Sequence, residues 1–185
     1  MWRAALSSAT TCRATSAEGT DLVLGLEGRT AISDDGDLRA GAAWGNLPAG
    51  EAFLAPVESS SEGTIVFDGS LAGYGMLREP VSVTVAGGRA VGADGEAADW
   101  LLDTLDAGGP DGRVLAELGI GTNPRAIVTG SILEDEKAVG TAHVAFGTNV
   151  SFGGTNLAAV HIDGVLLRPT IELDRRRFLE YGRFL

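Results

Sequence analysis

The sequence of 185 residues has one cysteine, few basic residues and no long apolar run. With Cys12 alone, no intrachain disulfide can form. No stretch approaches the roughly 20 apolar residues that span a bilayer, so no membrane partner is expected. The formal net charge is −11, from 25 acidic and 14 basic residues, which disfavours nucleic acid because a phosphate backbone requires a clustered cationic surface. These absences predict a soluble, cytoplasmic protein.

Several common catalytic patterns are also missing. The segment Gly119-Ile120-Gly121 lacks the third glycine of a dinucleotide fingerprint, and the sequence contains no P-loop. There is no Gly-x-Ser-x-Gly elbow to support a serine nucleophile. Nucleotide binding and serine hydrolysis are therefore not expected.

The residues that are abundant indicate a folded domain of many short elements. Hydrophobic residues make up 44% of the chain, and 27 glycines with 6 prolines cluster between the candidate elements. Alternating patterns predict strands over 21–26 and 63–68 and a hairpin over 81–85 and 89–91. The apolar stripe over 96–107 predicts one amphipathic helix, with Trp100 on its core side.

The second half continues this pattern. Strands are expected over 114–118, 143–146, 157–162 and 165–173, with a mixed segment around 127–137. The prediction is an α+β fold with a β-rich mixed sheet and few helices, and closure of that sheet toward a barrel is left open. Residues 1–18 are expected to be a disordered or variable N-terminus, and residues 19–185 a metal-binding catalytic domain.

The two histidines carry the strongest chemical signal. In a strand, the side chains of His161 and Asp163 project from one face, where both can bind one ion, and His143 lies eighteen residues earlier. Imidazole and carboxylate ligands favour Zn, Co, Mn or Fe. The alternative is that both histidines are hydrogen-bonded core residues and that Asp163-Gly164 is a turn. Further carboxylates that spacing alone cannot rank are Glu51, Glu117, Asp135 and Glu136.

Five motifs together resemble the catalytic part of the metal-dependent aminopeptidases typified by aminopeptidases T and S. The resemblance runs from about Gly19 to the C-terminus, and family members carry a further α/β domain in front, which this sequence lacks. The motifs, in order, are Asn46-Leu-Pro-Ala-Gly-Glu51, Gly121-Thr-Asn-Pro124, Leu133-Glu-Asp-Glu-Lys137, Gly140-Thr-Ala-His-Val-Ala-Phe-Gly147 and His161-Ile-Asp163.

This resemblance implies a two-metal aminopeptidase. It implies two divalent ions, Zn, Co or Mn, which activate a water that hydrolyses the N-terminal peptide bond. Peptide N-termini would be the substrate, and the protein would be a homodimer. Glu62 or Glu58 is the candidate general base. The metal ligands implied by the matching positions are Glu51, Glu117, His143, His161 and Asp163.

The resemblance also leaves two other functions open. Aminopeptidases of this type have a tyrosine seven residues after the first histidine, where this chain has Val150. The same fold family resembles the dihydroxypyridine dioxygenases, in which two histidines and an aspartate bind one Fe(II), and His143, His161 and Asp163 supply that triad. The first alternative is therefore a non-haem Fe(II) ring-opening dioxygenase. The second is an inactive, metal-stabilised assembly module.

Overall fold

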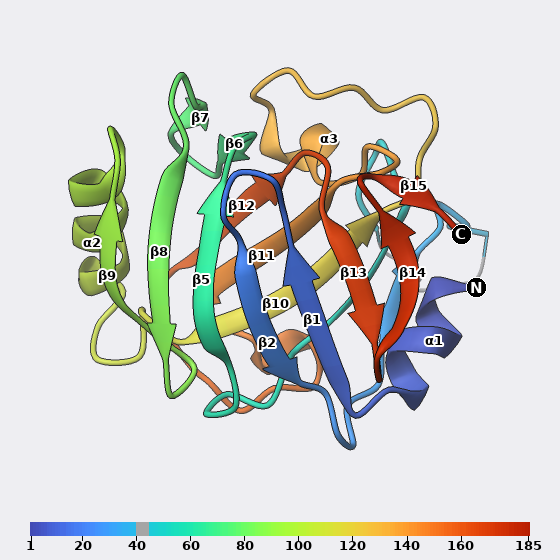
Figure 1. Cartoon of the computed structure of the whole chain (residues 1–185), viewed down its shortest axis with the longest axis horizontal. Coiled ribbons are helices and arrows are strands. Elements are labelled where there is room, and N and C mark those ends of the chain that lie inside the picture. The colour runs from blue at the N-terminus through green and yellow to red at the C-terminus, as the bar shows by residue number, and fades with distance from the viewer. Residues whose placement is uncertain (40–44) are drawn as a thin grey trace.

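Two antiparallel sheets form the fold in the computed structural model, which describes residues 1–39 and 45–185 (Figure 1). The eight-stranded sheet has the order β15 (Arg183–Phe184), β14 (Arg176–Glu180), β13 (Thr170–Leu173), β1 (Thr11–Thr15), β2 (Asp21–Gly25), β5 (Glu62–Phe67), β8 (Val81–Ala86), β9 (Arg89–Asp94).

The seven-stranded sheet lies behind it in Figure 1, and its long strands cross those of the first. Its order is β3 (Ile32–Asp34), β4 (Glu51–Leu54), β10 (Leu115–Gly121), β11 (Ala142–Gly147), β12 (His161–Leu166), β6 (Ser70–Leu71), β7 (Gly75–Met76). The helices are α1 (Trp2–Ser8), α2 (Ala98–Ala107), α3 (Ile132–Asp135) and the 3-10 turn η1 (Val150–Phe152).

The hydrophobic core fills the space between the sheets. Strand β2 alternates exposed and buried residues, so that Leu22 and Leu24 face inward, as period-two patterning requires. Phe67 of β5 meets Phe146 of β11 edge to face, with ring centroids 6.5 Å apart. The inward face of the seven-stranded sheet is thus apolar, which leaves its other face for polar side chains.

The expected α+β fold, rich in β-structure and with few helices, is confirmed, and its strands form two antiparallel sheets. Every pairing between the named strands is antiparallel, and neither sheet closes on itself within the described residues. Successive strands such as β8 and β9 are joined by tight turns, which favour antiparallel pairing. The predicted helix over 96–107 is found as α2, in which Trp100 packs against the core.

The boundaries near the second histidine differ from the expected ones. Residues 157–160 precede the strand, which begins at His161 and runs through Asp163 and Gly164 to Leu166. The alternative in which Asp163-Gly164 is a turn is therefore wrong, because both residues pair with β11. The expected strand over 165–173 is divided between β12 and β13.

The N-terminal 18 residues are ordered, contrary to expectation. They form helix α1 and strand β1, which pairs with both β13 and β2. The apolar side chains of Trp2, Leu6 and Cys12 are buried, and this burial fixes a segment whose composition gave no amphipathic signal. Helix α1 also contacts β4, the strand that begins at Glu51.

In the described part of the chain, no helix is long and apolar enough to cross a membrane.

Replacement of Trp2 by alanine tests the attachment of α1. The indole is 6% exposed and contacts the rings of Phe178 and Phe184 at centroid distances of 5.9 and 5.6 Å. We expect Trp2→Ala to lower the free energy of unfolding by about 3 kcal/mol, measured by urea denaturation. Ala4 is exposed on the same helix, and Ala4→Ser is the matched control. A loss below about 1 kcal/mol would show that α1 contributes little to folding.

Candidate metal centre

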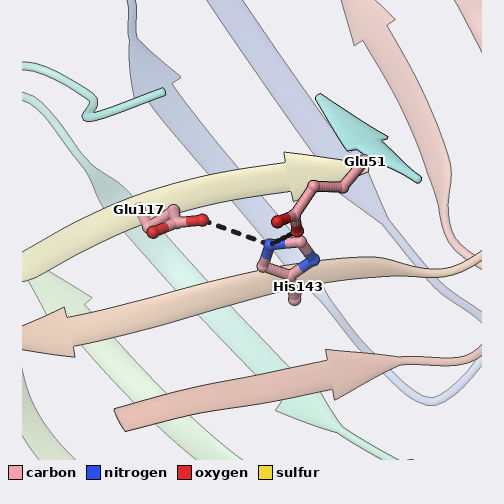
Figure 2. A group of neighbouring side chains, drawn as sticks. All are labelled: Glu51, Glu117 and His143. Carbon is pink, nitrogen blue, oxygen red and sulfur yellow. Dashed lines mark hydrogen bonds and ion pairs between the residues drawn. The ribbon is translucent and has the colours of Figure 1, made fainter. Parts of the chain in front are cut away.

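Four neighbouring strands bring the predicted ligands together on the outward face of the seven-stranded sheet. Glu51 begins β4, Glu117 lies on β10, His143 on β11, and His161 and Asp163 on β12. Figure 2 shows Glu51, Glu117 and His143 pointing toward one another from the first three of these strands. The structure thus brings the five residues close together, and their role as metal ligands stays a prediction.

Strand register explains why the ligands meet. Glu117 pairs with Ala145, and Ala145 pairs with Asp163, so the two carboxylates lie in one row with only a methyl group between them. In the next row Gly119 pairs with His143. Residues in register share a face, and the small side chains between the ligands leave room for an ion.

The absence of a side chain at Gly119 leaves space for the imidazole of His143. A Cβ at Gly119 would lie 2.0 Å from Nε2 of His143, closer than any real contact. The ring therefore lies directly over the backbone of β10, where only glycine leaves space. In the sequence Gly119 stands out only as part of a weak nucleotide motif, and no local pattern indicates its contact with His143.

His143 is completely buried, and its polar contacts are carboxylates. Its Nε2 lies 3.2 Å from Oε1 of Glu117 and 3.3 Å from Oε2 of Glu51. Among the described residues, neither Nδ1 of His143 nor Oε2 of Glu51 makes a hydrogen bond, although both are buried. Buried polar atoms without a partner are costly, and they are expected where a metal ion or water binds.

His161 has the arrangement of an oriented metal ligand. Its Nδ1 lies 2.8 Å from the carbonyl oxygen of Thr148, to which the Nδ1–H donates. Its Nε2 is then directed to Oε2 of Glu117 at 3.4 Å and to Oδ1 of Asp163 at 3.5 Å. A backbone carbonyl that fixes one ring nitrogen and leaves the other for the metal is common around bound ions.

Three overlapping sets of potential ligands result. In each set the ligand atoms lie within 4.8 Å of one another, and Glu117 belongs to two of the sets. The sets are Glu51–Glu117–His143, Glu117–His161–Asp163 and Glu136–His143–Asp163.

Lys137 is a further member of the cluster that sequence analysis did not identify. Its side chain is 0% exposed, and Nζ lies 3.0 Å from Oε1 of Glu51. It also forms an ion pair with Glu136. The residue stood in a quoted motif, but nothing in the sequence indicated that its ammonium group is buried.

The surrounding charges shift the pKa values of these groups. Burial raises the pKa of Glu51 to about 7, against the attraction of His143 and Lys137. Burial lowers the pKa of His143, but hydrogen bonding to Glu117 and the charge of Glu51 outweigh it and raise that pKa to about 9. For His161, Asp163 and Glu117 likewise outweigh burial and raise the pKa to about 11. The metal-free centre thus holds protons that a metal ion must displace.

The structure does not support Glu58 or Glu62 as general base. Glu58 accepts hydrogen bonds from the backbone N–H of Thr155 and from the Arg29 guanidinium. Burial raises the pKa of Glu58, but these contacts outweigh it and lower the pKa to about 2, so this carboxylate holds a proton poorly. Glu62 is exposed on β5 of the other sheet and accepts from the N–H of Gly87.

Asp135 also lies outside the ligand sets. Its carboxylate accepts hydrogen bonds from the hydroxyl of Ser70 and from the backbone N–H groups of Thr129 and Gly130. These contacts stabilise the loop before α3.

Aromatic rings lie beside His161. Phe53 of β4 contacts Phe152 of η1 at a centroid distance of 5.6 Å, and Phe152 contacts the His161 ring at 5.8 Å. Val150, at the position where the aminopeptidases have tyrosine, is 50% exposed on the same short turn. The residues beside this part of the centre are therefore apolar.

The donor set fits a divalent transition metal. Imidazole nitrogens and carboxylate oxygens without thiolate suit Fe(II), Mn, Co or Zn. The unpartnered Nδ1 of His143 and Oε2 of Glu51, and the oriented ring of His161, are independent observations consistent with a bound ion.

The fold and this donor set are those of a metalloenzyme. A family model described as NicX, 2,5-dihydroxypyridine 5,6-dioxygenase, matches residues 2–185. The chain therefore belongs to the 2,5-dihydroxypyridine 5,6-dioxygenase family. No curated protein matches it in a direct sequence comparison.

Two solved structures share the fold. A 2,5-dihydroxypyridine dioxygenase from Pseudomonas putida KT2440 is 24% identical with a TM-score of 0.91, and the match covers 100% of this chain and 57% of that one. Wild-type AmpT from Thermus thermophilus is also 24% identical, with a TM-score of 0.80, and the match covers 100% of this chain and 52% of that one. This chain thus spans little more than half the length of either protein. The resemblance to aminopeptidases holds for the fold, but the family match is to the dioxygenases.

The raised histidine pKa values predict a pH-dependent metal affinity. Below pH 9 the metal-free centre carries protons on His143 and His161, and a bound ion replaces them. Apparent affinity for Mn²⁺ should rise with pH between 7 and 9, by about tenfold per unit for each displaced proton. Calorimetric titration in buffers of different ionisation enthalpy should detect release of about two protons at pH 7. Binding without proton release would contradict this assignment.

Substitution of Gly119 tests the placement of His143. Gly119→Ala should displace the imidazole and weaken Mn²⁺ binding by about 10- to 100-fold, measured by calorimetry. Gly92→Ala on β9 is the matched control, because a Cβ there meets nothing within 4 Å. Unchanged affinity in Gly119→Ala would mean that His143 does not bind the ion.

Proposed function

We propose that this chain carries the metal centre of an Fe(II)-dependent dioxygenase that opens a hydroxylated aromatic ring. The observation that carries the proposal is the family match over residues 2–185, combined with two histidines and an aspartate on the adjacent strands β11 and β12. Asp163 belongs to one ligand set with His161 and to another with His143. Two histidines and one carboxylate are the usual ligands of non-haem Fe(II) oxygenases.

The residues around the centre would have different roles in this reaction. His143, His161 and Asp163 would hold the ion, and a bound Fe(II) would supply the redox chemistry that lets oxygen react with the ring. Thr148 orients His161 through its carbonyl oxygen. The partly exposed side of the cluster, at His161 and Asp163, is where a substrate would reach the ligands.

The aromatic rings favour a planar substrate. The rings of Phe53 and Phe152 stand edge to face, next to His161. An aromatic substrate that bound beside them would gain apolar contact on one side and metal coordination through its hydroxyl groups on the other. A dihydroxypyridine, the compound in the family's description, has this chemistry.

A two-metal aminopeptidase is the second candidate. It is favoured by the position of Glu117, which belongs to two neighbouring ligand sets as a bridging carboxylate would, and by the structural similarity to AmpT. That reaction would use peptide N-termini and two ions. The dimer implied by this resemblance stays a prediction.

Activity assays on the chain loaded anaerobically with Fe(II) distinguish these functions. With 2,5-dihydroxypyridine and air, we expect oxygen uptake with loss of substrate absorbance, and His161→Ala should reduce the rate at least about 100-fold because a metal ligand is lost. Asp99→Asn, exposed on α2, should leave the rate unchanged. Hydrolysis of aminoacyl amides by the Mn²⁺ or Zn²⁺ form, without oxygen uptake by the Fe(II) form, would overturn the dioxygenase proposal. Inert protein with tightly bound metal would support an assembly module.

A further inference from the structure

Residues 148–156, the first part of the connection from β11 to β12, form a loop that lies against His161. The carbonyl oxygen of Thr148 accepts a hydrogen bond from Nδ1–H of His161 at 2.8 Å. The ring of Phe152 stands edge to face with the imidazole, at a centroid distance of 5.8 Å. The other side of the imidazole is partly exposed, so its direction depends on where this loop lies.

The base of the loop is held from within by the buried side chain of Asn149. The backbone N–H of Asn149 donates to the carbonyl oxygen of Asn156 at 3.0 Å, and its Oδ1 accepts from the N–H of Asn156 at 2.8 Å. Gly154 leaves the space that this side chain fills, since a Cβ there would lie 2.0 Å from Cγ of Asn149. The tip of the loop, residues 150–155, extends beyond these contacts and needs a partner elsewhere in the fold.

An ion pair of Arg29 and Glu58 supplies that partner. Oε1 of Glu58 accepts hydrogen bonds from the backbone N–H of Thr155 at 2.7 Å and from Nδ2 of Asn149 at 3.2 Å. Oε2 of Glu58 accepts from Nη2 of Arg29, whose Nη1 donates to the carbonyl oxygen of Gly153 at 2.6 Å. Glu58 and Arg29 precede these loop residues by 97 and 124 positions, so the pair ties the loop tip to distant segments.

This ion pair is better placed to hold backbone than an ordinary surface pair. The side chains of Arg29 and Glu58 are 15% and 21% exposed, so water screens their charges only in part. An exposed pair contributes roughly 0–1 kcal/mol, whereas removal of either partner here would also leave backbone groups of the loop without their hydrogen bonds. Burial raises the pKa of Glu58, but its contacts outweigh burial and lower that pKa to about 2. The carboxylate therefore keeps its charge at neutral pH.

We propose that Arg29 and Glu58 are positioning residues that form a brace and keep the imidazole of His161 in its metal-binding direction. The brace acts through the loop tip, which carries Phe152, and through Thr148 at the base of the loop. With the brace in place, Nδ1–H is held by the carbonyl oxygen and Nε2 faces the carboxylates of the cluster. Without it, the imidazole is free to turn. The proposal rests on the proposed metal centre, but not on the reaction.

Nuclear magnetic resonance of the histidine rings provides the direct test. The chain has two histidines, so the ring signals of ¹⁵N-histidine-labelled protein loaded with Zn²⁺ are few. We expect a slowly exchanging Nδ1–H proton on His161 in the wild type. Glu58→Ala and Arg29→Met should each raise its rate of exchange with water by at least about tenfold, because the loop that protects it opens more often.

Affinity for Zn²⁺ provides the second readout. Each of the two variants should weaken Zn²⁺ binding by about 10- to 100-fold in calorimetry, as loss of a ligand's outer partner commonly does. The double variant should bind no more weakly than either single one, because the two residues act as one unit. Glu58→Gln keeps an acceptor for the N–H of Thr155, so its effect should be smaller, and it replaces Glu58→Ala if that variant does not fold.

Asp21→Ala is the matched control. Asp21 forms the same kind of arginine–carboxylate pair with Arg13, at 2.8 Å, but lies exposed on β2 of the other sheet. This variant should change neither the exchange rate nor the Zn²⁺ affinity. Unchanged exchange and affinity in both brace variants, or equal losses in Asp21→Ala, would overturn the proposal.

These measurements need no turnover, so they separate the brace from the proposed reaction. Faster exchange and weaker Zn²⁺ binding in the brace variants, without oxygen uptake by the Fe(II) form of the wild type, would uphold the brace and refute the dioxygenase. Oxygen uptake by the wild type, with exchange and affinity unaffected in the brace variants, would do the reverse.

Discussion

Four carboxylates must share one space from which water is largely removed, and much of this molecule is arranged around that constraint. Glu51, Glu117 and Glu136 are buried, and Asp163 lies beside them. Each unpaired charge in such a place lowers stability by several kcal/mol, so positively charged groups must lie among the carboxylates. Two imidazoles and the ammonium of Lys137 meet this need in part, and a metal ion would complete it.

The sheet provides the precision that this arrangement needs. Antiparallel pairing of β4, β10, β11 and β12 aligns the ligands in rows, and Gly119 and Ala145 leave the space between them. The opposite face of the same strands packs into the core through residues such as Phe146. A shift of register by one residue would turn the ligands into the core, so core packing and site geometry depend on each other.

The same fold is compatible with two chemistries, which is why the site and not the fold must decide the function. Similarity to the Pseudomonas dioxygenase and to AmpT establishes the architecture that all three share. The family match favours ring cleavage. The physical difference between the two candidate functions lies in the number of ions that each would use.

The sequence by itself determined the types of ligand and much of the local structure. Alternation located β2, β5 and the β8–β9 hairpin, the apolar stripe located α2, and the spacing of His161 and Asp163 placed both on one strand face. These features are local, because a period of two or of 3.6 is set by neighbours along the chain. Five motifs, taken together, also located all five candidate ligands, although the family resemblance favoured the aminopeptidase over the dioxygenase.

Features that depend on residues far apart in the chain were decided only by the tertiary structure. The order of the first 18 residues follows from Trp2 packing against Phe178 and Phe184, at the far end of the chain. Glu58 proved to be paired with Arg29, and Lys137 proved to be buried against Glu51. Burial and charge pairing are properties of the folded space around a side chain, and residues far apart in the chain create that space, so no local pattern records them.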